Sequence, residues 1–240
     1  MKLYRFDRVL VIAPHADDDV LGCGGVISRL VREGADVSVA VMTSGNAGDP
    51  DLFPLAGTLQ GRKEAIESHK VLGVKDTFFY DFPAPRLDTY PSYKISIAIE
   101  ERIRELEADT IFVPHRGDLH KDHRVVFEAA LVAARPINDN PVKRIFTYET
   151  LSETEWSSPY GDDVFFPTVF IEIQEQDLEK KLAAFKCYSP PRRQIPPHPR
   201  SIEGIRNLAK LRGATISSGY AEAFCSIREI CRVPLEDAEG

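Results

Sequence analysis

The chain has few of the features that mark membrane, secreted or nucleic-acid-binding proteins. No stretch of its 240 residues approaches the roughly 18 apolar residues that a membrane-spanning helix needs. Its 4 cysteines form no CxxC pair, so we expect small buried hydrophobic residues rather than disulfides or a zinc cluster. Lysine and arginine form no run and the net charge is −7, so the chain lacks the basic footprint that nucleic acids require.

We expect no secretion signal in the N-terminal segment. Its apolar run, Val9–Pro14, is too short for the apolar region of a signal peptide and leads directly into His15 and three aspartates. We therefore expect a cytoplasmic protein without a membrane span. The content of 43% apolar and 28% charged residues is that of an ordinary globular chain, and 240 residues suit one large α/β domain.

Apolar runs alternate with helical patterns in the first part of the chain. A continuous apolar run is typical of a parallel strand covered on both faces, and this alternation predicts a Rossmann-like, mostly parallel sheet flanked by helices. The expected strands are Arg8–Ala13, Val37–Met42, Thr77–Tyr80 and Thr110–Val113, and the expected helices are Val20–Glu33, Thr58–Leu72, Tyr93–Glu107 and Asp122–Ala134.

The pattern is looser beyond this core. We expect one domain over residues 1–240, with the Rossmann-like core at 1–136 and a less regular part at 137–240. In the second part we expect strands Lys143–Tyr148 and Thr168–Ile173 and helices Gln176–Lys186 and Ser201–Leu211. Long loops are expected at Thr43–Pro54, Pro83–Pro91, Leu151–Pro167 and Ser189–Arg200, where substrate specificity would lie.

The segment Pro14–Asp19, which reads PHADDD, directly follows the first expected strand. Three neighbouring carboxylates raise one another's pKa unless a positive charge lies between them, and a divalent cation supplies such a charge. Histidine with aspartate suits zinc and related metals. The alternative is that Asp19 caps the next helix while Asp17 and Asp18 face water.

A second polar segment follows the fourth expected strand. His115–His123 holds three of the chain's 6 histidines and two aspartates, and histidine is the usual proton shuttle and metal ligand near neutral pH. If the first four strands have the order 3-2-1-4, both polar segments meet in one crevice at the carboxyl ends of strands one and four. Gly22–Gly25 does not match the dinucleotide fingerprint, so we expect these glycines to allow close helix packing instead of NAD binding.

These residues resemble the motifs of the LmbE/PIG-L family of zinc-dependent N-acetylglucosaminyl deacetylases. That family has A-H-P-D-D-E after strand one and H-x-D-H after a later strand; this chain has PHADDD at Pro14–Asp19 and HKDH at His120–His123. The segments Arg62–Gly73 and Ser201–Phe224 also resemble family regions. Two positions depart from the pattern: Ala16 replaces proline and Asp19 replaces glutamate, which puts the supporting role of that glutamate in doubt.

The resemblance implies a role for each motif residue. The metal ligands would be His15, Asp18 and His123, with zinc as the expected metal and iron or cobalt as alternatives. Asp17 would be the general base. His120, in protonated form, would stabilise the oxyanion, and Asp122 would orient and charge it.

The implied activity is removal of the N-acetyl group from a small amino-sugar substrate, with release of acetate. Two alternatives remain: an amidase of a sugar–thiol conjugate, and a metal-dependent binding protein without turnover. The sequence leaves the rest of the substrate and the oligomeric state open, including a homo-oligomer.

Several residues have two interpretations each. Arg62 would contact the substrate, or pair with Glu64 or Glu67 as a solvated helix arginine. His115 and Asp118 would support the second motif as loop residues, with His115 as the reserve metal ligand. For the remaining candidates we favour structural roles or surface positions over substrate contacts: His69, Trp156, Tyr160 and His198.

Overall fold

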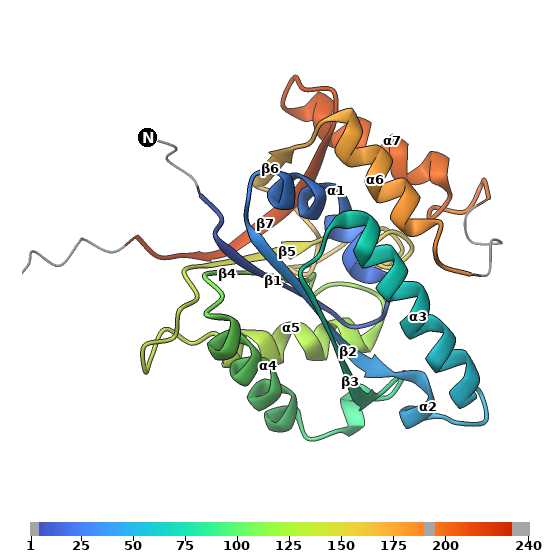
Figure 1. Ribbon diagram of the computed structural model, residues 1–240, viewed down its shortest axis with the longest axis vertical. Coiled ribbons are helices and arrows are strands. Elements are labelled where there is room, and N and C mark those ends of the chain that lie inside the picture. Colours follow the sequence, from blue (N-terminus) through green and yellow to red (C-terminus); the bar gives the residue numbers. More distant parts are fainter. Residues whose placement is uncertain (1–4, 190–194, 232–240) are drawn as a thin grey trace, which may run out of the picture.

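A seven-stranded sheet in the order β3-β2-β1-β4-β5-β7-β6 forms the middle layer of the protein (Figure 1). The structure is a computed structural model that describes residues 5–189 and 195–231. Strands β1 to β5 are parallel, and β7 runs antiparallel between β5 and β6. The strands are β1 (Arg8–Ala13), β2 (Asp36–Ser44), β3 (Asp76–Pro83), β4 (Thr110–Pro114), β5 (Arg144–Tyr148), β6 (Val169–Glu172) and β7 (Ala221–Glu229).

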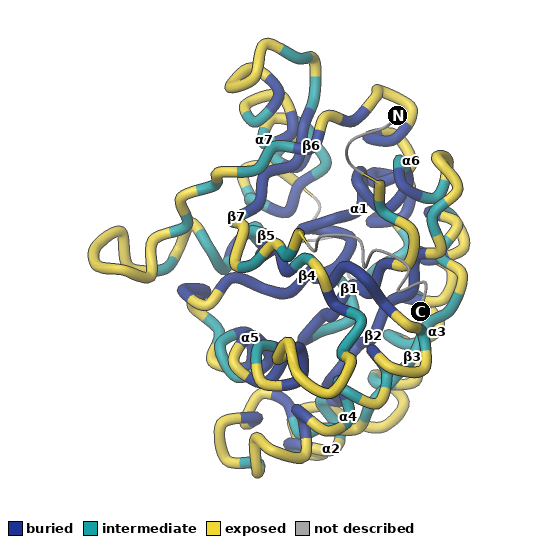
Figure 2. The backbone as a smooth tube through the Cα atoms, turned by 90° about the vertical axis from the view of Figure 1, so that its left-hand side faces the viewer, coloured by how far each residue is buried: buried dark blue, intermediate teal, exposed yellow. Residues whose placement is uncertain are grey.

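Helices cover both faces of the sheet. Alternate residues of β1 enter opposite cores: Val9 and Val11 pack with α1, α3, α6 and α7, whereas Leu10 and Ile12 pack with α4 and α5. Both sets are buried, which explains the continuous apolar run in the sequence (Figure 2). The helices are α1 (Asp18–Arg32), α2 (Gly45–Gly48), α3 (Leu55–Leu72), α4 (Ser92–Leu106), α5 (Lys121–Ala133), α6 (Glu175–Phe185) and α7 (Ile202–Thr215), with a short 3-10 helix, η1, at Leu87–Thr89.

The predicted fold class and the strand order 3-2-1-4 are confirmed. Element ends differ by a few residues: α1 begins at Asp18 instead of Val20, and α3 begins at Leu55 instead of Thr58. The expected loop Thr43–Pro54 contains the end of β2 and the short helix α2. Of the expected loop Ser189–Arg200, residues 190–194 lie outside the described part of the chain.

The sequence pattern does not predict strand β7, although this strand lies inside the sheet. Ala221–Phe224 are buried, but the second half of the strand is largely exposed, so the sequence shows no continuous apolar run. Since β5, β7 and β6 extend the sheet formed by β1 to β4, the less regular C-terminal part belongs to the same sheet as the core.

The glycines of α1 allow close packing, as predicted. A Cβ atom at Gly22 would lie 2.2 Å from the Tyr148 ring, and one at Gly24 would lie 2.8 Å from the Lys181 side chain. The expectation for the cysteines is wrong in part: Cys23 is buried, but Cys187 and Cys225 are half-buried and Cys231 is exposed. Among the described residues, no helix has both the length and the apolar character of a membrane span.

Candidate metal centre and catalytic pocket

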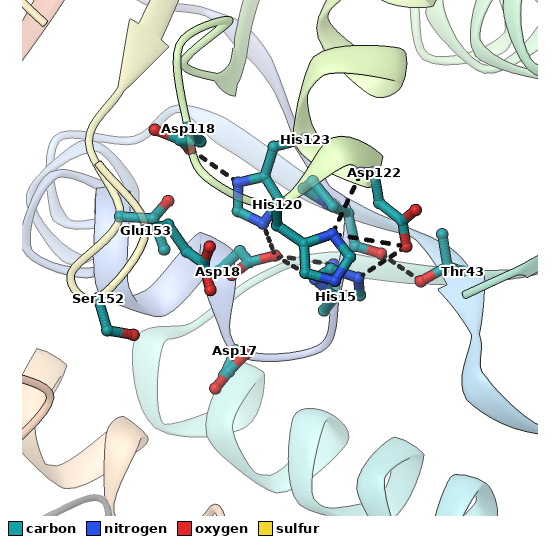
Figure 3. A network of polar contacts seen from close by, with 12 residues as sticks. His15, Asp17, Asp18, Thr43, Asp118, His120, Asp122, His123, Ser152 and Glu153 are labelled. Carbon is teal, nitrogen blue, oxygen red and sulfur yellow. Dashed lines mark hydrogen bonds and ion pairs between the residues drawn. The ribbon is translucent and has the colours of Figure 1, made fainter. Parts of the chain in front are cut away.

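Two polar segments meet at the carboxyl ends of β1 and β4, which are hydrogen-bonded neighbours in the sheet. His15 follows β1, and Asp18 is the first residue of α1. His123 lies in the first turn of α5, in the connection that follows β4. The sheet order therefore brings together side chains about a hundred positions apart in the sequence, as predicted (Figure 3).

His15, Asp18 and His123 form a compact cluster whose candidate ligand atoms all lie within 4.8 Å of one another. Oδ2 of Asp18 lies 3.1 Å from Nδ1 of His15 and 3.2 Å from Nε2 of His123. This Nε2 atom is buried, and its contact with Asp18 lacks hydrogen-bond geometry. A buried ring nitrogen without a hydrogen bond is unfavourable unless another group binds it.

Two further carboxylates contact the histidine ring nitrogens that do not face Asp18. Nδ1 of His123 lies 2.8 Å from Asp118, and Nε2 of His15 lies 3.1 Å from Asp122. The two acids lie on opposite sides of the histidines in Figure 3. Metal-binding histidines usually donate their second N–H to such a carboxylate, which fixes the ring and leaves the inner nitrogen for the metal.

The acids and histidines shift one another's pKa. Burial lowers the pKa of His15, but hydrogen bonds to Asp122 and Asp18 outweigh it and raise the pKa to about 9. Burial also lowers the pKa of His123, but the charge of Asp18 and the hydrogen bond to Asp118 raise it to about 10. Burial raises the pKa of Asp18, whereas the charge of His123 holds it well below its usual range. Both imidazoles are therefore protonated at neutral pH without a cation.

The cluster fits a divalent metal. The charge of a divalent ion equals that of the two protons on the imidazolium rings. Metal binding would release these protons, because a ligand nitrogen carries none. Two imidazole nitrogens and one carboxylate oxygen suit zinc and neighbouring transition metals, and three protein ligands leave a coordination position open. A second group, His15, His120 and Asp122, also lies within metal-binding distance but shares His15 with the first.

His120 is placed at the edge of the cluster, with its ring centroid 4.6 Å from that of His15. Its Nδ1 accepts a hydrogen bond of 3.1 Å from the backbone N–H of Asp122. Burial, and then the charge of His15, lower its pKa to about 4. Without a cation His120 is therefore neutral at neutral pH, with its hydrogen on Nε2, whereas the predicted role uses a protonated ring. Its Nδ1 lies 3.9 Å from the carboxylate of Asp122, which binds His15.

Asp17 lies beside the cluster and forms an ion pair that the sequence does not reveal. Its Oδ2 accepts a hydrogen bond of 2.9 Å from Arg200, which is 5% exposed. Arg200 also donates to Ser152 at 2.7 Å and lies 3.3 Å from Glu153. The partners are 47 to 183 positions from Arg200 in the sequence, so no local pattern marks the contact.

Asp19, the position that departs from the family motif, is buried and bound to a histidine of α3. Its Oδ2 lies 2.8 Å from Nε2 of His69, whose Nδ1 lies 2.8 Å from Oγ1 of Thr77. The contact ties the start of α1 to α3 and β3. His69 is therefore a structural histidine, and the alternative that Asp19 only caps α1 is wrong.

A cavity of about 650 Å³ opens beside the cluster. His15, Asp17, Asp18 and His120 line one end of it, and Arg62 lines the wall formed by α3. The guanidinium of Arg62 donates to Asp81 at 2.6 Å and to the backbone oxygen of Tyr80 at 3.1 Å. The alternative of a pair with Glu64 or Glu67 is therefore wrong; those glutamates bind other partners.

The other candidate residues do not join the cluster. Nε2 of His115 donates to the backbone oxygen of Asp163 at 2.8 Å, so His115, the reserve ligand, does not contact the cluster of His15, Asp18 and His123. His198 packs against Trp156 with ring centroids 5.9 Å apart. Trp156 and Tyr160 are exposed, and neither lines the cavity.

Comparison with known sequences identifies relatives of the chain. The sequence model described as GlcNAc-PI de-N-acetylase, PIG-L, matches residues 10–134. An Escherichia coli K12 protein named uncharacterized deacetylase YaiS is 33% identical over 183 residues, which cover 74% of this chain and 88% of the relative.

Two solved structures illustrate the range of chemistry on this fold. The N,N'-diacetylchitobiose deacetylase of Pyrococcus horikoshii is 26% identical, with a TM-score of 0.72 over 93% of this chain and 84% of that protein. GalB of Pseudomonas putida KT2440, a 4-carboxy-2-hydroxymuconate hydratase, is 18% identical, with a TM-score of 0.73 over 96% of this chain and 100% of that one. The second likeness concerns the fold alone, so the reaction has to be argued from the site.

Proposed function

Because the chain belongs to the PIG-L/LmbE family of deacetylases, we propose that it removes the N-acetyl group from an N-acetylglucosamine-type amino sugar or its conjugate in a metal-dependent hydrolysis. The observation that carries the proposal is the cluster of His15, Asp18 and His123 at one end of the cavity, with Asp17 beside it. The similarity to a diacetylchitobiose deacetylase supports an acetamido sugar as the substrate.

The metal, expected to be zinc, would be held by His15, Asp18 and His123. When bound, such an ion lowers the pKa of a water molecule and polarises a carbonyl oxygen. The carboxylates of Asp118 and Asp122 contact these two histidine rings and would keep their other nitrogens directed to the ion.

Asp17 would act as the general base. Its carboxylate lines the cavity, next in the chain to the ligand Asp18, and would accept the proton of the water that attacks the acetamide carbon. When the C–N bond breaks, the same carboxyl group would pass this proton to the leaving amine, so that acetate and a free amino sugar result. Arg200 holds Asp17 in place through the ion pair of 2.9 Å.

His120 would stabilise the negative charge that develops on the carbonyl oxygen. Because the backbone of Asp122 occupies Nδ1, the hydrogen of the neutral ring is on Nε2, from which it can be donated to an oxyanion in the cavity. This role needs no positive charge on His120.

Release of acetate tests the proposal. Purified protein is treated with a chelator, supplied with zinc, iron or cobalt, and assayed on acetamido sugars and on a sugar–thiol conjugate. We expect metal-dependent acetate release that is lost in Asp17→Asn, a variant that retains the three ligands. Cleavage of the thiol conjugate alone would favour an amidase, and metal uptake without any product would favour a binding protein.

A further inference from the structure

The cavity is larger than the catalytic end requires. Its volume of about 650 Å³ lies within the range of roughly 300–1,000 Å³ that is typical for drug-sized ligands, which exceed a single sugar ring. From His15 and His120 it continues along the segment that joins α2 and α3. A substrate whose acetamide group is at the metal centre therefore leaves room for a second group.

Part of the cavity lining outside the catalytic residues is apolar. Leu52, Phe53 and Pro54 line it from the segment before α3, and Phe79 lines it from β3. Leu52 is 65% exposed and Phe53 is 41% exposed, although both are large hydrophobic side chains. Exposed apolar side chains that gather at a pocket are typical of a surface that a ligand covers.

Two glycines of α3 leave the floor of this part of the cavity open. Gly57 and Gly61 are one helical turn apart, and both line the cavity. A Cβ atom at either position would meet no atom within 4 Å, so packing within the protein does not require glycine there. Glycine lowers the stability of a helix, so Gly57 and Gly61 destabilise α3 without improving packing in the free protein.

The charges of the cavity do not favour an anionic group. Among the described residues that line it, the guanidinium groups are those of Arg62 and Arg200. Asp81 pairs with Arg62 at 2.6 Å, and Asp17 pairs with Arg200 at 2.9 Å. Each guanidinium that lines the cavity is therefore already paired with a carboxylate.

On the basis of the proposed function, we propose that the substrate is an N-acetylated amino sugar that carries an uncharged, apolar group, and that this group lies against Leu52, Phe53 and the α3 floor at Gly57 and Gly61. The apolar wall and the paired arginines distinguish such a substrate from a sugar with a phosphate or carboxylate group at the same place.

The test compares three substrates with the metal-loaded protein: N-acetylglucosamine, its octyl glycoside and its 1-phosphate. We expect kcat/KM for the octyl glycoside to exceed both others by about ten-fold or more, since burial of a few methylene groups gives such a factor. In Leu52→Ala and Phe53→Ala this advantage should shrink. Leu59→Ala, which changes an exposed leucine of α3 outside the cavity, is the matched control and should retain it.

Binding gives a second, independent measurement. Calorimetric titration of the metal-free protein with the octyl glycoside should show an affinity that falls in Gly61→Leu, because the added side chain fills the floor. Circular dichroism checks that Gly61→Leu is folded. If it is not folded, the same titration is made with the Leu52→Ala protein.

The outcomes separate this inference from the proposed function. Equal kcat/KM for all three substrates, or a preference for the 1-phosphate, overturns the inference and leaves the deacetylase activity in place. Acetate release from none of them overturns the proposed function, and the inference with it.

Discussion

The neighbours of His120 determine its chemistry. It lines the cavity as a neutral ring, with Nδ1 held by a backbone N–H. We expect His120→Ala to lower kcat by about 100- to 1,000-fold, the usual effect of losing one oxyanion donor. Metal content should not change, because His120 is not among the three proposed ligands.

The measurement is steady-state acetate release together with metal analysis of the same sample. His115→Ala is a useful comparison, since His115 is in the same β4–α5 connection but binds the Asp163 backbone outside the cavity. A His120→Ala protein with full metal content and a normal kcat would remove His120 from the mechanism.

The carboxylates behind the histidines lead to a second residue-scale prediction. Asp118 is buried and holds Nδ1 of His123 at 2.8 Å. Asp118→Asn should weaken metal binding by about 10- to 100-fold, because the ring of His123 loses its fixed orientation and part of its basicity. Competition with a chromophoric chelator measures this. Asp88→Asn, a change at a more exposed acid, is the control and should bind metal normally.

At the scale of elements, a buried ion pair joins α6, β7 and α1. Nζ of Lys181 lies 2.5 Å from Glu222 and donates to the backbone oxygen of Leu21 at 2.7 Å. Glu222 accepts hydrogen bonds from the backbone N–H groups of Gly25 and Val26, within α1. The pair therefore attaches the helix that begins with Asp18 to the C-terminal half of the chain.

Lys181→Met should destabilise the protein by roughly 3–5 kcal/mol, because the carboxylate of Glu222 would stay buried without its cation. Thermal unfolding measures the effect. Lys180→Met, at the exposed neighbouring position of α6, should leave the melting temperature nearly unchanged. Equal melting temperatures for the two variants would mean that the buried pair contributes little to stability.

The elements that sequence predicts well are those with a local pattern. The apolar run Arg8–Ala13 records burial on both faces, and the motif Pro14–Asp19 at its end identifies the candidate metal centre. The contact of Arg200 with Asp17 and that of Asp19 with His69 join distant positions by single side chains. Such contacts leave no periodicity in the sequence, and only the folded arrangement reveals them.

At the scale of the whole molecule, the cluster of His15, Asp18 and His123 makes stability depend on pH. The pKa values of His15 and His123 are raised to about 9 and about 10 in the absence of a cation. A histidine whose pKa is higher in the folded than in the unfolded protein stabilises the fold. This contribution is fully present below the unfolded-state pKa near 6.5 and is lost as the pH rises through the folded-state pKa. The metal-free protein should therefore lose stability progressively between about pH 6.5 and pH 10.

Melting temperatures of chelator-treated and zinc-loaded protein across this range provide the measurement. The zinc-loaded protein should lose less stability, because the imidazoles that bind metal carry no proton on their ligand nitrogens. Parallel pH curves for the two forms would contradict the proposed ligand set.

The place of β7 between β5 and β6 affects how the protein is made. β5 and β6 both precede Ala221–Glu229 in the chain, and neither pairs with the other directly. During synthesis, both strands therefore leave the ribosome before β7 is made, and each has an edge without its hydrogen-bonding partner until then. Unpaired strand edges template contacts between molecules, so a nascent chain that stops before Ala221 should aggregate, and chaperones should bind it until β7 emerges.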